Sequence, residues 1–245
     1  MNATYLRLEL LRALRSPRYL VLVVGMPVGL FLLFAALYGD GTQDGISGKA
    51  WLMVSMSVFG AMGAAVSVGG RIAGERQVGW TRQLRLSPLP GWAYVTVKAA
   101  TALLVAVPAL ALVYAVGAAA EGVRLPAARW AEAAGWSLLA LAPFVALGIW
   151  LGHRLTVDVI GPLSGALFTA LGVLGGIWVP VDQLPSGLRT VARDLPSYWL
   201  AQAGREPLAG SWIGWSGLGV LALWTALFAL LAVRAYRRDT ARTRA

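Results

Sequence analysis

The sequence predicts an all-α membrane protein with six transmembrane helices and both termini in the cytoplasm. Three observations predict it: the composition, six long uncharged stretches, and the distribution of basic residues. Hydrophobic residues make up 58% of the 245 residues and charged residues only 13%, whereas soluble domains have about 45–50% and about 25%. Together with a mean hydropathy of +0.67, this composition indicates that the main solvent of the chain is the lipid bilayer.

Six stretches contain no Asp, Glu, Lys, Arg or His. A helix needs about 20 apolar residues to cross the hydrocarbon core of a bilayer, and no other uncharged stretch of the chain approaches that length. The six stretches cover residues 19–39, 50–70, 99–120, 133–152, 159–181 and 207–233, with 210–233 as the expected helix of the last. They fill most of the chain, so we expect a single membrane domain over residues 1–245.

The basic residues set the orientation, because Lys and Arg gather in cytoplasmic loops. With the N-terminus inside, 15 of the 21 basic residues fall on the cytoplasmic side, which carries a net charge of +11 against −1 outside. The formal charge of +10 is therefore a topology signal, and we expect no nucleic-acid partner. Nineteen of the 21 are Arg, as in GC-rich bacterial genomes, so we expect a multi-pass protein of the bacterial cytoplasmic membrane.

The sequence offers little to catalyse a reaction or hold a metal. There is no Cys, and His153 is the single histidine, which excludes thiolate and multi-histidine sites. No phosphate-binding loop is present. Few ionisable residues lie within the spans, where an ion-coupled carrier would need them. We therefore expect no catalytic, cofactor or metal residues, and a solute that is apolar or amphipathic. A membrane-embedded lipid enzyme is disfavoured for the same reason.

The N-terminal segment, residues 2–16, is a candidate interfacial helix. Its leucines lie mainly on one face, and we assign its contacts to Arg7, Arg12 and Arg15. It either lies on the inner leaflet, touching lipid headgroups or a partner, or serves only as a positive N-terminus that fixes the topology.

The longest cytoplasmic connection, residues 71–98, contains charged residues at helical spacing over 74–86 and then the helix-breaking run 87–91. A short charged helix at this face suits docking to a soluble protein, whereas the alternative is an ordinary solvated loop. The candidate contact residues are Glu75, Arg76, Gly79, Arg82, Leu84 and Arg85.

The longest external segment, residues 182–206, has apolar residues at i, i+4, i+7 and i+11: Leu184, Leu188, Val191 and Leu195. This spacing is one face of a helix, with Ser186 as the expected N-cap and Pro196 as its end. We expect a short amphipathic helix in the outer leaflet.

The second and fifth spans are rich in small residues, which let membrane helices approach closely. Such residues either pack within the chain, which we favour for Gly172 and Gly176, or form a dimer seam or pathway wall. The candidates for the seam or pathway are Ser55, Phe59, Phe168, Thr169, Gly172 and Gly176.

Two motifs carry a family resemblance. The first is Gly74-Glu75-Arg76-Gln77-Val78-Gly79-Trp80, followed by Gln83-Leu84, Ser87-Pro88-Leu89 and Lys98. The second is Gly175-Gly176-Ile177-Trp178-Val179-Pro180, followed by Leu184-Pro185 and Leu195-Pro196. In this order, the motifs resemble the membrane subunit of type-2 ABC exporters, which include daunorubicin-type drug-efflux permeases. Trp80 stands before Thr81, where the family often has Thr directly after the glycine.

The resemblance implies a half-transporter. Two copies of the permease would pair, and two separate ATPase subunits, which bind ATP and Mg²⁺, would dock on the cytoplasmic side. Residues 75–85 would form the coupling helix, beside the N-terminal helix. The second and fifth helices would line a cavity for a drug, antibiotic or lipid, closed outside by residues 184–204. A membrane protein that binds a soluble partner without transport is the alternative.

Overall fold

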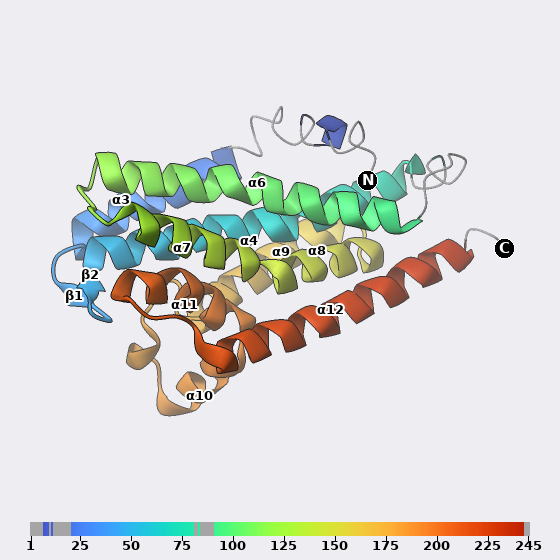
Figure 1. Cartoon of the computed structure of the whole chain (residues 1–245). Helices are drawn as coiled ribbons and strands as arrows, with labels where there is room; N and C mark the ends of the chain where they lie inside the picture. The colour runs from blue at the N-terminus through green and yellow to red at the C-terminus, as the bar shows by residue number, and fades with distance from the viewer. Residues whose placement is uncertain (1–6, 10, 12–20, 81–82, 84–90, 243–245) are drawn as a thin grey trace.

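The computed structural model describes residues 7–9, 11, 21–80, 83 and 91–242, which are almost entirely helical (Figure 1). This confirms an all-α membrane protein. Within these described residues, five segments are long and apolar enough to cross a membrane, and α3 is a shorter apolar helix. The elements are the π-helix η1 (Val21–Gly25), α3 (Met26–Tyr38), β1 (Thr42–Gln43), β2 (Ile46–Ser47), α4 (Gly48–Gln77), α6 (Gly91–Ala119), α7 (Ala127–Leu139), α8 (Ala142–Arg154), α9 (Val157–Leu174), the 3-10 helix η2 (Val181–Gln183), α10 (Ser186–Asp194), α11 (Pro196–Ala209) and α12 (Gly214–Arg242).

Helix α4 is the centre of the bundle and is buried along most of its length. It packs against α3, α6, α8, α9 and α11. It approaches α8 backbone to backbone, because a Cβ atom added to Gly148 would lie 2.8 Å from the carbonyl oxygen of Val66. A Cβ atom on Gly152 would lie 2.6 Å from the carbonyl oxygen of Gly69. The small-residue pair that brings two backbones together is therefore Gly148 and Gly152, which the sequence analysis did not select.

Several helices extend beyond the uncharged stretches that predicted them. Helix α4 continues to Gln77, and α6 begins at Gly91, eight residues before the predicted third span. Lys98 therefore lies inside a helix and does not open one. The uncharged stretch marks the part of a helix that lipid tolerates, whereas the helix itself continues for as long as its backbone hydrogen bonds do.

Two predicted spans contain a break or an early end in the helices of the structure. The fourth, 133–152, is divided into α7 and α8 with a break at Ala140–Leu141, because Pro143 has no N–H to continue the hydrogen-bond ladder. The fifth, 159–181, ends as a helix at Leu174, and Gly176 then takes a φ of +72°. This left-handed conformation suits glycine and turns the chain out of the helix.

The external segment forms two helices, α10 and α11. Pro185, rather than Ser186, is the N-cap of α10, and no side chain caps it. Helix α10 ends at Asp194, and Pro196 begins α11, where the missing proline N–H costs nothing. The predicted N-cap was therefore wrong, while the short helix before the last span is present.

The two ends of the described chain lie at the same end of the bundle. Near the N-terminus, Glu9 bonds to Lys98 of α6, and near the C-terminus, Asp239 of α12 bonds to Arg76 of α4. The β1–β2 hairpin lies at the opposite end (Figure 1). This arrangement agrees with the prediction that both termini lie on one side of the membrane.

Candidate functional site

The end of the bundle at which both described chain ends lie contains a buried cluster of charges around Lys98. The Lys98 side chain is fully buried, and its Nζ atom lies 2.8 Å from Oε2 of Glu9 and also pairs with Glu75. The hydroxyl of Tyr94 donates a hydrogen bond of 2.8 Å to Oε2 of Glu75. One ammonium group therefore joins the N-terminal segment, α4 and α6.

Glu75 is buried in this cluster. The residue is only 5% exposed, and its carboxylate contacts Lys98 and Tyr94 instead of water. Burying an ion costs free energy unless the ion is paired and hydrogen-bonded. Lys98 supplies the ion pair for Glu75, and Tyr94 supplies a hydrogen bond. The structure thus places this proposed coupling residue inside the bundle, as a connection between helices. The feature of the sequence that could have indicated this burial is Lys98, one of only two lysines in the chain.

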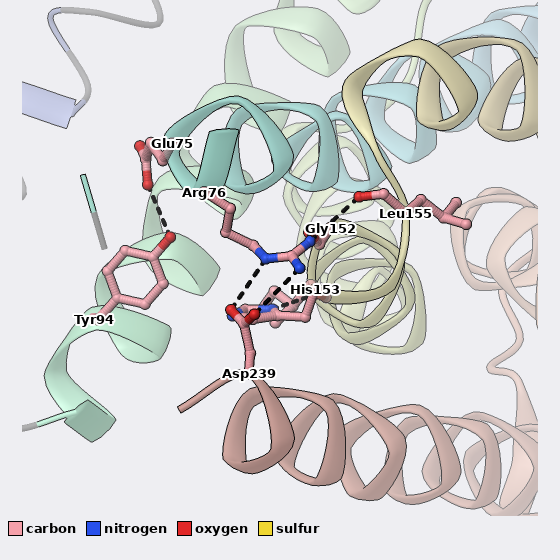
Figure 2. A network of polar contacts seen from close by, with 8 residues as sticks. Glu75, Arg76, Tyr94, Gly152, His153, Leu155 and Asp239 are labelled. Atoms are coloured by element: carbon pink, nitrogen blue, oxygen red, sulfur yellow. Dashed lines mark hydrogen bonds and ion pairs between the residues drawn. The ribbon is translucent and has the colours of Figure 1, made fainter. Parts of the chain in front are cut away.

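A second polar network centres on Arg76 (Figure 2). Its guanidinium bonds to both carboxylate oxygens of Asp239, at 3.0 and 3.2 Å. It also donates to the carbonyl oxygens of Gly152, at 3.0 Å, and Leu155, at 3.3 Å. Paired bonds of this kind fix geometry as well as contributing energy. Arg76 therefore joins α4, α8 and α12 just before α4 ends, and the sequence analysis did not identify Asp239 as its partner.

Helix α4 ends in a turn at Gly79, whose φ is +73°. A Cβ atom added to Gly79 would meet no other atom within 4 Å, so the conformation and not the available space requires glycine here. Val78 is 75% exposed and Trp80 is 39% exposed. The turn therefore presents apolar side chains at the same end of the bundle as the Lys98 cluster.

Some of the candidate contact residues lie outside the described residues: Arg12, Arg15, Arg82, Leu84 and Arg85. Arg7 is described and exposed. In the external layer, Leu184 and Leu195 are half-buried, whereas Leu188 and Val191 are exposed on α10.

Most of the candidate seam residues of the second and fifth spans are buried within this chain. The rings of Phe59 and Phe168 lie 4.1 Å apart, and Phe59 meets the edge of Trp178 at 5.1 Å. A Cβ atom on Gly172 would lie 3.2 Å from Nε1 of Trp178, so this glycine packs within the chain. Of the six candidates, Thr169 is the one on an exposed face.

Ser55 and Gly176 both contact a buried arginine that the sequence analysis placed in an external loop. Arg205 of α11 is 5% exposed. It donates to Oγ of Ser55 at 2.6 Å and to the carbonyl oxygen of Gly176 at 2.8 Å. Its guanidinium also lies 3.8 Å from the ring of Trp51. No pattern in the sequence marks Arg205, because its partners lie on distant segments.

The comparisons with known proteins agree with this architecture. A family model described as ABC-2 type transporter matches residues 3–208, so the chain belongs to the ABC-2 type transporter family. It is a multi-pass membrane protein and the permease of an ABC transporter. It is similar to a protein of Bacillus subtilis (strain 168) named "Putative transport permease YvfS", with 27% identity over 234 residues, which are 95% of this chain and 96% of that protein.

Proposed function

We propose that this permease exports a hydrophobic or amphipathic small molecule, such as a drug, an antibiotic or a lipid, across the cytoplasmic membrane of a bacterium. The match of the ABC-2 family model over residues 3–208 carries the proposal. The transport energy would come from ATP and Mg²⁺ bound to a separate ABC ATPase, which permeases of this family use in general. The apolar character of the spans supports an apolar solute.

Co-expression with the ABC ATPase of the same operon tests this function. The tagged permease should retain the ATPase subunit during purification, in a complex with two copies of each. Reconstituted into liposomes, that complex should hydrolyse ATP. A permease that purifies in folded form without binding any ATPase would contradict the proposal and favour a membrane protein of another role.

The turn at Gly79 is the proposed coupling point, because it ends α4 and directs the chain toward residues 80–86. Gly79→Val forces a β-branched residue to adopt a φ of +73°, which L-residues avoid. We expect the exit of α4 to reorient and the amount of ATPase retained by the permease to fall at least tenfold.

Gly74→Val is the matched control for Gly79→Val. Gly74 lies in the last turn of α4, five residues before Gly79, and a Cβ atom there also meets nothing within 4 Å, but its φ is not positive. This variant should retain the ATPase as the wild type does. Equal retention by both variants would rule out the Gly79 turn as the coupling point. Glu75→Ala is less informative, because it also disrupts the Lys98 cluster.

A second copy of the permease would pair through α9. This helix is apolar and largely exposed in the protomer. Its exposed face carries small residues, and a Cβ atom on either Gly161 or Gly165 would meet nothing within 4 Å. Small residues on lipid-facing helices permit close helix–helix contact. Thr169 is exposed on the same helix and is therefore our candidate contact residue.

The absence of cysteine from the chain makes disulfide cross-linking a clean test of this seam. Thr169→Cys should give a covalent dimer in oxidised membranes, because the two copies of position 169 would lie close together. Leu223→Cys, on an exposed position of α12, should stay mainly monomeric. Equal cross-linking at both positions would indicate random collision in the membrane and would contradict an α9 seam.

A further inference from the structure

A cavity of about 530 Å³ opens at the end of the bundle opposite the Lys98 cluster. It lies between the end of α3, the β1 strand, the beginning of α4 and the segment 178–183. Its volume is within the range of small-molecule sites, about 300–1,000 Å³. In the predicted orientation this is the external end.

The walls of the cavity are aromatic and uncharged. Four aromatic side chains line it: Phe34, Tyr38, Trp51 and Trp178. Its polar side-chain amides come from Gln43 and Gln183. Apolar walls with a few neutral hydrogen-bonding groups are typical of sites for small organic ligands, and aromatic rings favour flat aromatic ligands, on which they stack.

Both indoles of the cavity contact neighbouring side chains. The Nε1 atom of Trp51 donates a hydrogen bond of 3.0 Å to Oδ2 of Asp44, and the guanidinium of Arg205 lies 3.8 Å from its ring. Trp178 is held by the edge-on contact with Phe59. Because these contacts fix the rings, the cavity is preformed, and little conformational entropy is lost when a ligand binds.

The cavity offers a charged ligand no net attraction. Arg205 and Asp44 both contact Trp51, and because their charges are opposite, their fields at that indole largely cancel. A charged ligand would also lose its hydration without finding an ion-pair partner in the lining.

We propose that this cavity is a binding site for an uncharged aromatic molecule, or for the uncharged aromatic part of a larger one. Arg205 acts as a positioning residue that holds Trp51. The inference deepens the proposed export function by naming a substrate class. Its test measures binding without ATP or an ATPase, so a failure of either proposal can be told from a failure of the other.

Photolabelling of the full-length permease in phosphatidylethanolamine–phosphatidylglycerol nanodiscs tests the site. The probes are benzophenone, the anion 4-benzoylbenzoate and the cation (4-benzoylbenzyl)trimethylammonium, which share one ring system. Mass spectrometry should locate saturable benzophenone adducts within residues 34–52 and 178–183, at least tenfold above those of either charged probe. Equal labelling by a charged probe, or labelling spread without saturation over lipid-facing helices, would overturn the proposal.

Two variants should fill the cavity: Val179→Phe and the exposed Gln183→Phe. Each should lower labelling of the site at least fivefold, whereas Thr190→Phe, on the exposed face of α10, should leave it unchanged. Wild-type labelling in both filled variants would overturn the proposal. Diphenylmethane should compete with benzophenone and n-dodecane should not, because competition by dodecane would indicate a groove for lipid chains.

Discussion

Lys98→Met is expected to destabilise the permease by about 3–5 kcal/mol, the range found when one partner of a buried ion pair is removed. Lys98 is fully buried, and it is the partner of both Glu9 and Glu75. The methionine would fit the space of the lysine stem but would leave two carboxylates buried without a cation. The free energy of unfolding can be measured by titration with SDS in mixed micelles, followed by the fluorescence of the 11 tryptophans.

Lys49→Met is the matched control. Lys49 also forms an ion pair, with Glu121 at 2.9 Å, but the two side chains are 37% and 17% exposed, so the Glu121 carboxylate that remains is in contact with water. Exposed pairs contribute little because water solvates the charge that remains, so this variant should unfold close to the wild type.

The double variant Lys98→Met/Glu75→Gln should recover part of the loss, since one carboxylate becomes neutral. An unfolding free energy of Lys98→Met equal to that of Lys49→Met would show that the cluster does not hold the bundle.

Gly148→Ala is expected to cost about 1–3 kcal/mol or more, the range for overpacking a tightly packed interior. The new methyl group would lie 2.8 Å from the carbonyl oxygen of Val66 and 3.0 Å from that of Ala65. Both neighbours are backbone atoms of the central helix, so no side chain can rotate away. The two helices must separate, which also loosens their contacts at Gly69 and Gly152. The same SDS titration measures the effect.

Gly135→Ala is the matched control for this substitution. Gly135 lies within α7, and a Cβ atom there would meet nothing within 4 Å. Alanine is favoured over glycine in helices by up to about 1 kcal/mol, so this variant should be as stable as the wild type or slightly more stable. A similar loss in both variants would contradict close backbone packing between α4 and α8.

That the chain contains several long apolar helices could be predicted, because this depends on local composition. The ends of the helices could not, as the break before Pro143 and the turn at Gly176 show. An uncharged stretch shows only which residues can lie in the hydrocarbon core of the bilayer. Where a helix stops depends on single residues, such as a proline without an N–H or a glycine with a positive φ, and on whether charged residues beyond the stretch find partners.

The candidate site residues were predicted less well than the fold. The sequence placed Glu75 and Arg76 either on a short charged docking helix or in a solvated loop, whereas the structure shows both in networks that join helices. The partners are Lys98, 23 residues from Glu75, and Asp239, 163 residues from Arg76. Contacts between residues so far apart leave no periodic pattern in the sequence. The sequence therefore does not distinguish a charged residue that is buried against a distant partner from one that is exposed to water.

The sequence by itself determined the class of this protein, an all-α membrane protein, and it predicted the spans and the side on which the termini lie. These predictions depend on transfer of residues from water to lipid, which is nearly additive along the chain. Only the tertiary structure decided that Gly148 and Gly152 bring two helix backbones together, that Lys98 and Arg205 are buried, and that an aromatic cavity lies at the end of the bundle opposite Lys98. These features depend on which segments meet in space, and that is a property of packing that no local pattern records.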